Sequence, residues 1–286
     1  MAEAMLSVTD LSTYLYCKRK LYLKKVLKFA EPVKDVMVLG TVRHLAFEGI
    51  NNVEEKLAKA IATDLQPEDI HANYKQEYAK ILRNAILQSK RELTQFQIPL
   101  DLAFQKAWPS VLVEAKCRAN NVLQCIATKQ VFGDALWEQL TPKIQAEVRI
   151  EAPQLFLKGI IDQVEIFPEH IVPVELKTGK APLTGIWPGH RAQVSAYMVL
   201  AEDALGKPVR EGRVRYLDTG EDRPIPANPF IRVEVTSLVG QVRSLLDATH
   251  VPSRLTNEAK CRPCGLRNQC FSDQTVDAQR KRILKA

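Results

Sequence analysis

The sequence predicts an α/β fold, and three features of the 286-residue chain support this class. From Asn51 to about Leu140, apolar residues return every three or four positions, which is the spacing of amphipathic helices. After Pro142 the pattern changes to alternating or continuous apolar runs of strand length, bounded by Pro, Glu or Gly. Helical spacing returns from His190 to Leu205, so predicted helices precede and follow the first predicted strands along the chain.

The individual elements follow from local signals. At the N-terminus, Ser7 and Thr9 can cap a short basic helix, on which we expect Cys17. Five later segments have strand-like patterns, at residues 144–152, 155–167, 171–178, 212–218 and 230–237. The first three form a predicted β-meander, and residues 238–249 have the pattern of a helix. Pro173 cannot donate to a central ladder, which predicts an edge strand or interrupted pairing there.

The charge balance favours a polyanionic partner such as nucleic acid, because 40 Lys and Arg against 33 Asp and Glu give a formal charge of +7. With 46% apolar residues, the chain can bury a substantial core. Its first residues lack the basic region and apolar run of a signal peptide, and no apolar run is long enough for a transmembrane helix. We therefore expect a soluble, cytoplasmic protein with no membrane partner.

Two carboxylates and a lysine stand out in the second and third predicted strands, namely Asp162, Glu175 and Lys177. A turn at residues 168–169 places Asp162 opposite Glu175, and alternation puts Glu175 and Lys177 on one face. Facing like charges destabilise a hairpin unless a cation compensates them. A Mg²⁺ or Mn²⁺ ion held by both acids would do so and suits phosphodiester chemistry. The competing interpretation is a solvated face with a surface Glu–Lys pair.

At these residues the sequence resembles the PD-(D/E)XK nuclease superfamily, whose signature is an acid, a spacer and then Glu-x-Lys on the next strand. Asp162, Glu175 and Lys177 match it. Two further elements narrow the resemblance to the RecB-like branch: a Gly-x-x-x-His element in "GTVRHLAFE", with His44, and a Gln-x-x-x-Tyr element in "QVSAY". The resemblance implies a mixed central sheet flanked by helices, with His44, Asp162 and Glu175 as metal ligands.

The second element supplies Gln193 and Tyr197. Because four residues separate them on a predicted helix, they share a face and can reach a substrate phosphate or base together. The resemblance implies that both lie beside the active site, where they join the two acids and the lysine as catalytic residues. His44 alone would be typical of a core or surface histidine, and only the company of the acids favours metal ligation.

A run of three cysteines near the C-terminus indicates a metal site. Cys261, Cys264 and Cys270 fall within ten residues, in "CRPCGLRNQC". Disulfides are rare in the cytosol, so ligation or simple burial must explain such cysteines. The spacing matches neither two zinc-ribbon knuckles nor a single-run ferredoxin, and it leaves zinc and an iron-sulfur cluster equally open.

The family resemblance favours the cluster, because RecB-like nucleases of the helicase-nuclease and CRISPR-associated kinds carry a 4Fe-4S cluster bound by one upstream and three C-terminal cysteines. "YLYCKRKLYL" resembles the upstream element and supplies Cys17. Such a cluster would clasp the N- and C-terminal segments together, worth roughly 5 kcal/mol by loop-closure entropy. Cys117 and Cys125 fall outside the pattern, and we expect both to be buried free thiols.

We expect four segments along the chain. An N-terminal helical part of the nuclease domain, with the first cluster cysteine, covers residues 1–50, and a large helical insertion covers 51–140. The nuclease core covers 141–254, and a cluster-binding segment with a basic tail covers 255–286. The insertion is longer than a minimal member of the family needs, which leaves its role and the substrate path open.

The resemblance implies a metal-dependent DNA exonuclease that trims single-stranded ends or overhangs. Because the chain contains no phosphate-binding P-loop motif, the nearest family is the stand-alone CRISPR-associated RecB-like exonuclease, which processes DNA before spacer integration. The expected partners are single-stranded DNA ends and the CRISPR integrase complex. Two alternatives stay open: a RecB-like repair nuclease working with a separate helicase, and a catalytically silent, cluster-bearing DNA-binding subunit.

Overall fold

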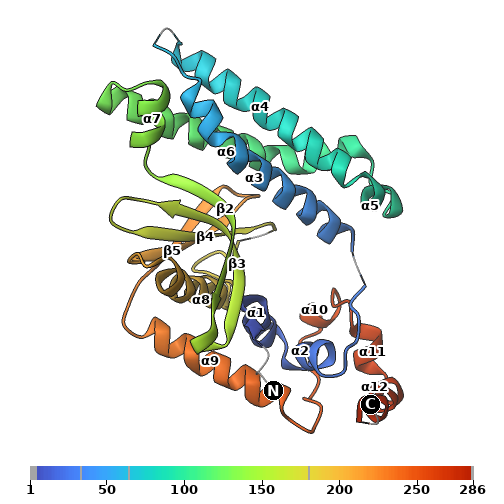
Figure 1. The fold of residues 1–286 in the computed structure, drawn as a ribbon. Coiled ribbons are helices and arrows are strands. Elements are labelled where there is room, and N and C mark those ends of the chain that lie inside the picture. The colour runs from blue at the N-terminus through green and yellow to red at the C-terminus, as the bar shows by residue number, and fades with distance from the viewer. Residues whose placement is uncertain (1–4, 33, 64, 180, 285–286) are drawn as a thin grey trace.

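The structure, a computed structural model, describes residues 5–32, 34–63, 65–179 and 181–284. Within these ranges one mixed sheet is flanked by helices on both faces (Figure 1), which confirms the predicted fold class. In chain order, the strands are β1 (Leu6–Ser7), β2 (Lys143–Ala152), β3 (Leu157–Ile166), β4 (Ile171–Lys177), β5 (Glu211–Tyr216) and β6 (Glu221–Pro226).

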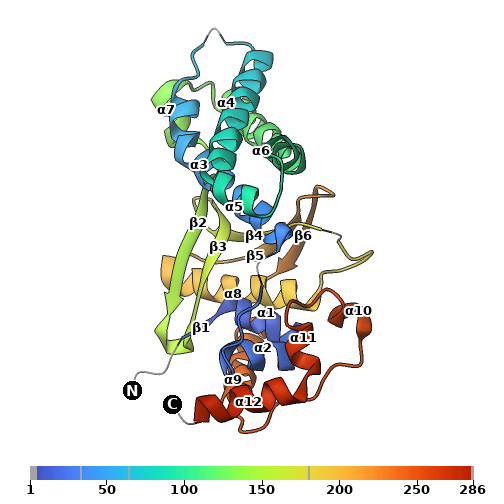
Figure 2. The ribbon, with the colours of Figure 1, turned by 90° about the vertical axis from the view of Figure 1, so that its right-hand side faces the viewer.

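The helices form three groups around the sheet. In chain order, they are α1 (Val8–Tyr16), α2 (Lys18–Lys25), α3 (Asp35–Lys59), α4 (Pro67–Gln88), α5 (Lys90–Gln95), α6 (Leu100–Lys129), α7 (Gly133–Gln139), the 3-10 turn η1 (Pro153–Leu155), α8 (Pro188–Leu205), α9 (Ile231–Leu246), α10 (Glu258–Cys261), α11 (Arg267–Phe271) and α12 (Asp273–Leu284). Figures 1 and 2 show α3 to α7 on one side of the sheet, α8 and α9 on the other, and the terminal helices together at one corner. Across the described ranges, no helix has the length and apolarity needed to span a membrane.

The sheet leaves part of one strand edge open. As predicted, β2, β3 and β4 form an antiparallel meander, while β4 and β5 run parallel. On the edge away from β2, β3 pairs with β1 through Leu157 and Lys158 and with β4 through residues 163–166. Residues 159–162 therefore lie between the two ladders, at the place where Asp162 projects.

Of the two outcomes predicted for Pro173, the structure shows interrupted pairing: β4 is an internal strand, and its pairing is irregular near Pro173. Strand β4 has β3 on one side and β5 on the other. On the β5 side, Ile171 faces Val209 and the continuous ladder begins only where Val174 faces Arg213. Between these two pairs β4 advances by three residues while the neighbouring chain advances by four. This irregular pairing accommodates Pro173, which has no N–H group to donate.

We expected residues 230–237 to be a strand, but residues 231–237 belong to helix α9 and Phe230 is its N-cap. The alternation in "FIRVEVTS" fits a strand, but the longer pattern is helical, because Ile231, Val235, Val239 and Val242 are all buried on one face. A strand would have placed Val233 on the same face as Ile231 and Val235, but Val233 is 66% exposed. The strand prediction was wrong because the eight-residue window was too short to separate the two periods.

The N-terminal helix predicted around Cys17 is two helices. Ser7 is the N-cap of α1, and its backbone N–H donates to Oδ2 of Asp10 at 2.9 Å. Helix α1 ends before Cys17, whose extended backbone starts the basic helix α2, and Cys17 Sγ accepts a bond from the N–H of Lys20. Cys17 is thus an N-cap residue at a bend and does not lie inside a helix.

The stretch from 51 to 140 is helical, as predicted, and has its own apolar core. Residues from α3, α4, α6 and α7 form this core, among them the fully buried Tyr74, Tyr78 and Leu82. Helix α3 runs unbroken through the boundary that we expected after residue 50. The second core lies between the sheet and helices α1, α8 and α9, and a third small cluster joins α2 to α11 and α12.

A buried polar network joins the helical layer to the sheet. Arg118 on α6, which is 2% exposed, donates to Glu114 at 2.7 Å and to Glu54 on α3 at 3.2 Å. Glu114 also accepts from Gln163 on β3 at 3.2 Å and lies 3.6 Å from Arg215 on β5. Because buried charges are stable only when paired, these contacts fix how the helices dock on the sheet.

Candidate active site

The predicted site residues line one cleft of about 690 Å³. The meander forms its floor, α3 and α8 contribute side chains from opposite sides of the sheet, and the start of α1 closes one wall. Six residues predicted from the sequence line this cleft: His44, Asp162, Glu175, Lys177, Gln193 and Tyr197. The fold therefore brings together residues that span more than half of the chain.

The hairpin register predicted from the turn is the one observed. Ile166 faces Ile171 and Gln163 faces Val174, and the N–H of Phe167 donates to the carbonyl of His170 at 2.9 Å. Continuing this register brings Asp162 opposite Glu175. The regular ladder stops one pair before that point.

The side chain of Asp162 replaces the missing backbone contact at the end of the ladder. Its Oδ2 accepts from the N–H of Leu176 at 2.7 Å. That bond holds the carboxylate against β4, where the side chain is buried. Burial raises the pKa of Asp162, while His44 and the Leu176 N–H act in the opposite direction.

Glu175 is the most deeply enclosed acid of the cleft, at 3% exposure. Its Oε1 accepts from Nε2 of Gln193 at 2.6 Å and from Nζ of Lys177. Its Oε2 is buried without a hydrogen-bond partner among the residues that the structure describes. Burial first, and then the charge of Asp162, raise the pKa of Glu175 to about 8. A cation beside Oε2 would satisfy that oxygen and offset the repulsion between the two acids.

Gln193 and Tyr197 extend this chain of contacts from α8. Oε1 of Gln193 accepts from Nζ of Lys177 at 3.0 Å, so one amide orients both the lysine and Glu175. Nε2 of Gln193 also lies 3.4 Å from the hydroxyl of Tyr197, one helical turn away. Gly159 on β3 leaves the space for that tyrosine ring, since a Cβ there would come within 2.6 Å of its Cε1.

Glu147 on β2 belongs to the same cleft, although our sequence analysis did not select it. Its flanking pairs, Ala146 with Gln163 and Val148 with Ile161, put it across from Asp162. The residue has a φ of 53°, in the left-handed region that non-glycine residues seldom adopt. In the sequence Glu147 is one of several polar residues that alternate along a predicted strand, so nothing local distinguishes it. Only the register of β2 against β3 could have identified it as a site residue.

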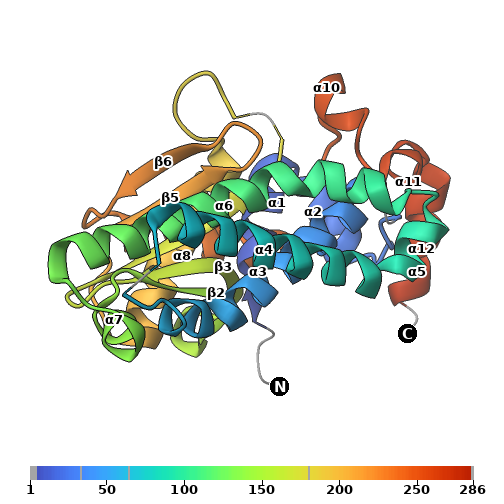
Figure 3. The ribbon, with the colours of Figure 1, turned by 90° about the horizontal axis from the view of Figure 1, so that it is seen from above.

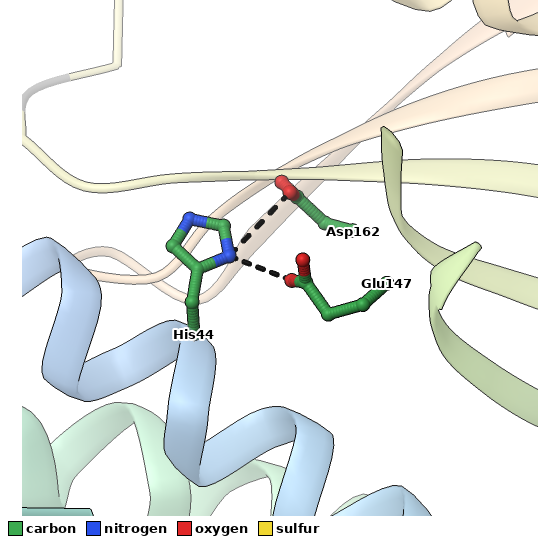
Figure 4. Close-up of side chains that lie close together, drawn as sticks. All are labelled: His44, Glu147 and Asp162. Atoms are coloured by element: carbon green, nitrogen blue, oxygen red, sulfur yellow. Dashed lines mark hydrogen bonds and ion pairs between the residues drawn. The ribbon is translucent and has the colours of Figure 1, made fainter. Parts of the chain in front are cut away.

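His44 approaches the acids from helix α3. Its Nδ1 lies 2.7 Å from Oε1 of Glu147 and 3.8 Å from Oδ1 of Asp162 (Figure 4). The bond to Glu147 raises the pKa of His44 to about 9. One ligand atom from each residue lies within 4.8 Å of the other two, which is the spacing needed around one cation. This donor set, with the unsatisfied oxygen of Glu175, fits a hard divalent ion such as Mg²⁺ or Mn²⁺.

The four cysteines predicted to act together line a single small cavity. Cys17 contributes from the start of α2, and Cys261, Cys264 and Cys270 contribute from the C-terminal segment. Burial raises the pKa of the Cys17 thiol. Four thiols around one space fit a four-cysteine ligand set.

The two remaining cysteines lie on α6. Cys125 is buried, as expected, whereas Cys117 is exposed. The prediction of burial for Cys117 was therefore wrong, because its position on α6 is open to solvent even though the charges of Glu114 and Arg215 lie near its thiol.

A mixed sheet whose neighbouring strands present acids and a lysine to one cleft, under a histidine from a helix, is an arrangement suited to holding a divalent cation beside a phosphodiester. A family model, the PD-(D/E)XK nuclease superfamily, matches residues 5–271, and the chain belongs to that superfamily. This agrees with the resemblance drawn from the sequence motifs.

Three relatives show how the match is distributed. The chain is 26% identical over 160 residues to a CRISPR-associated exonuclease Cas4/endonuclease Cas1 fusion of Leptospira interrogans, covering 52% of this chain and 30% of the relative. A fusion of the same name from Myxococcus xanthus is 31% identical over 168 residues, covering 55% and 29%. The DNA replication ATP-dependent helicase/nuclease DNA2 of Gallus gallus is 25% identical over 298 residues, covering 94% and 28%. The chain thus spans less than a third of the length of these curated relatives.

Proposed function

We propose that the protein is a metal-dependent deoxyribonuclease that trims single-stranded DNA ends or overhangs. The observation that carries this proposal is the convergence of Asp162, Glu175 and Lys177 in one cleft beneath His44. An isolated Glu–Lys pair would be a surface ion pair of little consequence. Here the acids are buried and one of their oxygens has no partner among the described residues, so the arrangement is costly unless it binds a cation.

In this proposal His44, Asp162 and Glu175 hold the metal, and Glu147 either joins them or orients His44. A bound Mg²⁺ or Mn²⁺ would act as a Lewis acid on the scissile phosphodiester. The chain's own residues then have distinct roles. The Leu176 N–H fixes the orientation of Asp162, and Glu147 keeps Nδ1 of His44 turned toward the acids.

We propose that Lys177 assists the attack of water on the phosphate. Its Nζ is held between Oε1 of Glu175 and Oε1 of Gln193, beside the acids rather than out in solvent. An ammonium group at this position can orient a water molecule and neutralise charge that develops on the phosphate. Tyr197 supports Gln193 from the next turn of α8 and so positions the lysine indirectly.

We propose that the four cysteines hold a 4Fe-4S cluster that clasps the termini. The cavity that they line supports this assignment, and so do direct contacts between the two segments. The hydroxyl of Tyr16 donates to the carbonyl of Lys260 at 2.9 Å, and Arg19 donates to the carbonyls of Pro252 and Cys270. The cluster would supply a covalent cross-link at the end of this interface and no step of the hydrolysis.

For the biological role we propose processing of DNA before CRISPR spacer integration, with the integrase complex as partner. Two of the relatives are named as fusions of a Cas4 exonuclease with a Cas1 endonuclease, which supports a shared reaction sequence. The second candidate is a repair nuclease working with a helicase. The match to a helicase/nuclease over 94% of this chain favours it specifically.

One assay tests the nuclease proposal. End-labelled single-stranded and duplex DNA are incubated with the wild-type protein and with Asp162→Ala, in Mn²⁺, in Mg²⁺ and in EDTA. We expect metal-dependent shortening of the single strand by the wild type only. Equal cleavage by Asp162→Ala would show that the activity arises elsewhere. A wild type without activity in either metal would leave the silent DNA-binding subunit as the better description.

A further inference from the structure

A second groove, of about 760 Å³, lies next to the metal cleft. It is formed by the second half of α1, the start of α2, the first turn of α8, and α10 with its N-cap residue. Figures 2 and 3 both show α10 on the same side of the molecule as the yellow loop that leads from β4 to α8. None of the nuclease chemistry described above uses this groove.

The groove carries aromatic rings on its surface. Trp187, the N-cap residue of α8, is 47% exposed, and Tyr16 at the end of α1 is 37% exposed. Tyr16 is fixed in place, because its hydroxyl bonds the carbonyl of Lys260 and the Lys260 ammonium lies 5.2 Å from its ring centre. Exposed rings held on rigid helix ends are the platforms on which unpaired bases stack.

The charge of the groove is also of one sign. Lys20 and Lys260 line it, and no Asp or Glu occurs among the described residues that form its wall. Lys20 is paired with Glu31 at 2.8 Å, whereas the Lys260 ammonium contacts a backbone carbonyl and a ring and keeps its net charge. A wall that combines aromatic rings with uncompensated positive charge is complementary to a nucleic-acid backbone with exposed bases.

The groove and the metal cleft share two helices. Helix α1 gives Val8 and Thr9 to the cleft and Ser12 and Tyr16 to the groove. On α8, His190 lines the groove, and three residues later the helix presents Gln193 to the cleft. A strand lying in the groove would therefore be within about one helical turn of the site proposed for cleavage.

We propose that this groove binds single-stranded DNA beside the active site, with bases stacked on Trp187 and Tyr16 and a backbone phosphate next to Lys260. This inference rests on the proposed function, which supplies the substrate class. It selects single strands over duplex, since only unpaired bases expose their faces to a protein ring. The groove would thus position the strand and take no part in the chemistry.

The test measures binding without cleavage. Fluorescence anisotropy in EDTA compares the wild type with Trp187→Ala, Trp187→Phe and Phe230→Ala on a labelled single-stranded oligonucleotide. Phe230 is an exposed aromatic at the start of α9, outside the groove, and serves as the matched control. We expect Trp187→Ala to weaken binding at least about fivefold, Trp187→Phe to restore most of the loss, and Phe230→Ala to bind as the wild type does.

A second oligonucleotide, with abasic sites in place of its central bases, separates stacking from charge attraction. If the bases stack on Trp187, the wild type should bind the abasic strand about as weakly as Trp187→Ala binds the intact one. Equal affinity of the wild type and Trp187→Ala for the intact strand would overturn the proposal, and so would a loss in Trp187→Ala that persists unchanged on the abasic strand.

The cleavage assay with Asp162→Ala, run alongside, keeps the two proposals apart. A wild type that cleaves DNA while the groove variants bind normally would leave the nuclease standing and remove the groove. A wild type that binds through Trp187 but cleaves in no metal would do the reverse.

Discussion

Glu147 on β2 and Asp162 on β3 lie opposite each other on neighbouring strands, and both carboxylates approach the same atom, Nδ1 of His44. A third acid, Glu175, continues the same row on β4. Three neighbouring strands thus place one acid each at the same level, under one histidine. This row explains why the cleft combines strong mutual repulsion with a geometry suited to a cation.

The position of Glu147 predicts a role in metal affinity. Glu147→Gln keeps the volume but removes the charge that faces His44, so the affinity for Mn²⁺ should fall by about ten- to a hundredfold. Titration calorimetry measures this. Glu151→Gln, an exposed residue of the same strand and cleft, is the matched control and should bind Mn²⁺ normally. Equal affinity in both variants would exclude Glu147 from the site.

Glu175→Gln should abolish cleavage while leaving the metal-free protein at least as stable as the wild type. The reason is that the carboxylate is buried beside Asp162 with one oxygen lacking a partner among the described residues, so the neutral amide relieves repulsion. Thermal unfolding in EDTA and a cleavage assay in Mn²⁺ measure the two effects. If the variant were unfolded, and if added metal did not change the thermal stability of the wild type, the acids would have a structural role and would not bind metal.

Tyr197→Phe should slow cleavage by about one to two orders of magnitude and leave metal binding and folding unchanged. Its hydroxyl contacts Gln193, which in turn holds Lys177 and Glu175, so the loss acts through positioning. Single-turnover rates at saturating Mn²⁺ for Tyr197→Phe and Gln193→Ala provide the measurement. Wild-type rates in both would remove this face of α8 from the active site.

Protein purified without oxygen should be brown, with broad absorbance near about 400 nm, if the four cysteines hold a 4Fe-4S cluster. Cys270→Ala should lose both colour and solubility, because a clasp between the termini is lost. Cys117→Ala, an exposed thiol on α6, should keep both. A colourless wild type with stoichiometric zinc would disprove the iron-sulfur assignment while preserving the clasp.

His190 should make the stability fall at acid pH. Burial first, and then the charge of Lys177, lower its pKa to about 4, and its Nδ1 lies 3.2 Å from the hydroxyl of Tyr216. Because the pKa of His190 is lower in the folded state than in the unfolded state, protonation favours the unfolded state. The contribution of His190 to stability is therefore complete above about pH 6.5 and is lost as the pH falls toward its folded-state pKa.

The measurement compares urea unfolding of the wild type and His190→Gln. Between about pH 7 and about pH 4.5, the wild type should lose on the order of 1 kcal/mol more than the variant, a value reduced for partial solvent screening. Parallel losses in the two proteins would mean that His190 is solvated and titrates normally.

Much of the site follows from the sequence because its information is local. The turn at residues 168–169 sets the hairpin register, and the register alone brings Asp162 toward Glu175. Helical spacing likewise places Gln193 and Tyr197 on one face. These are relationships between residues close along the chain, where simple periodicity holds.

The features that sequence reasoning missed depend on longer-range or irregular structure. Glu147 contributes through a left-handed backbone inside a strand and through pairing between two strands. The helix at Ile231 to Leu246 was mistaken in part for a strand, since its first seven residues satisfy both periods. The docking of α6 on the sheet joins Glu114 to Gln163 and Arg215, which lie far from it in sequence, and no local pattern indicates it.

That docking determines how modular the protein is. Arg118 is enclosed by Glu54 and Glu114, and Glu114 is shared with Gln163, the immediate neighbour of Asp162 on β3. Excising the helical layer would therefore leave Gln163 without its acceptor and expose to water the apolar sheet residues that the layer covers. The helices and the sheet should therefore unfold in one cooperative transition. A meander transferred alone into another protein would carry the acids but would lack the helices that align them.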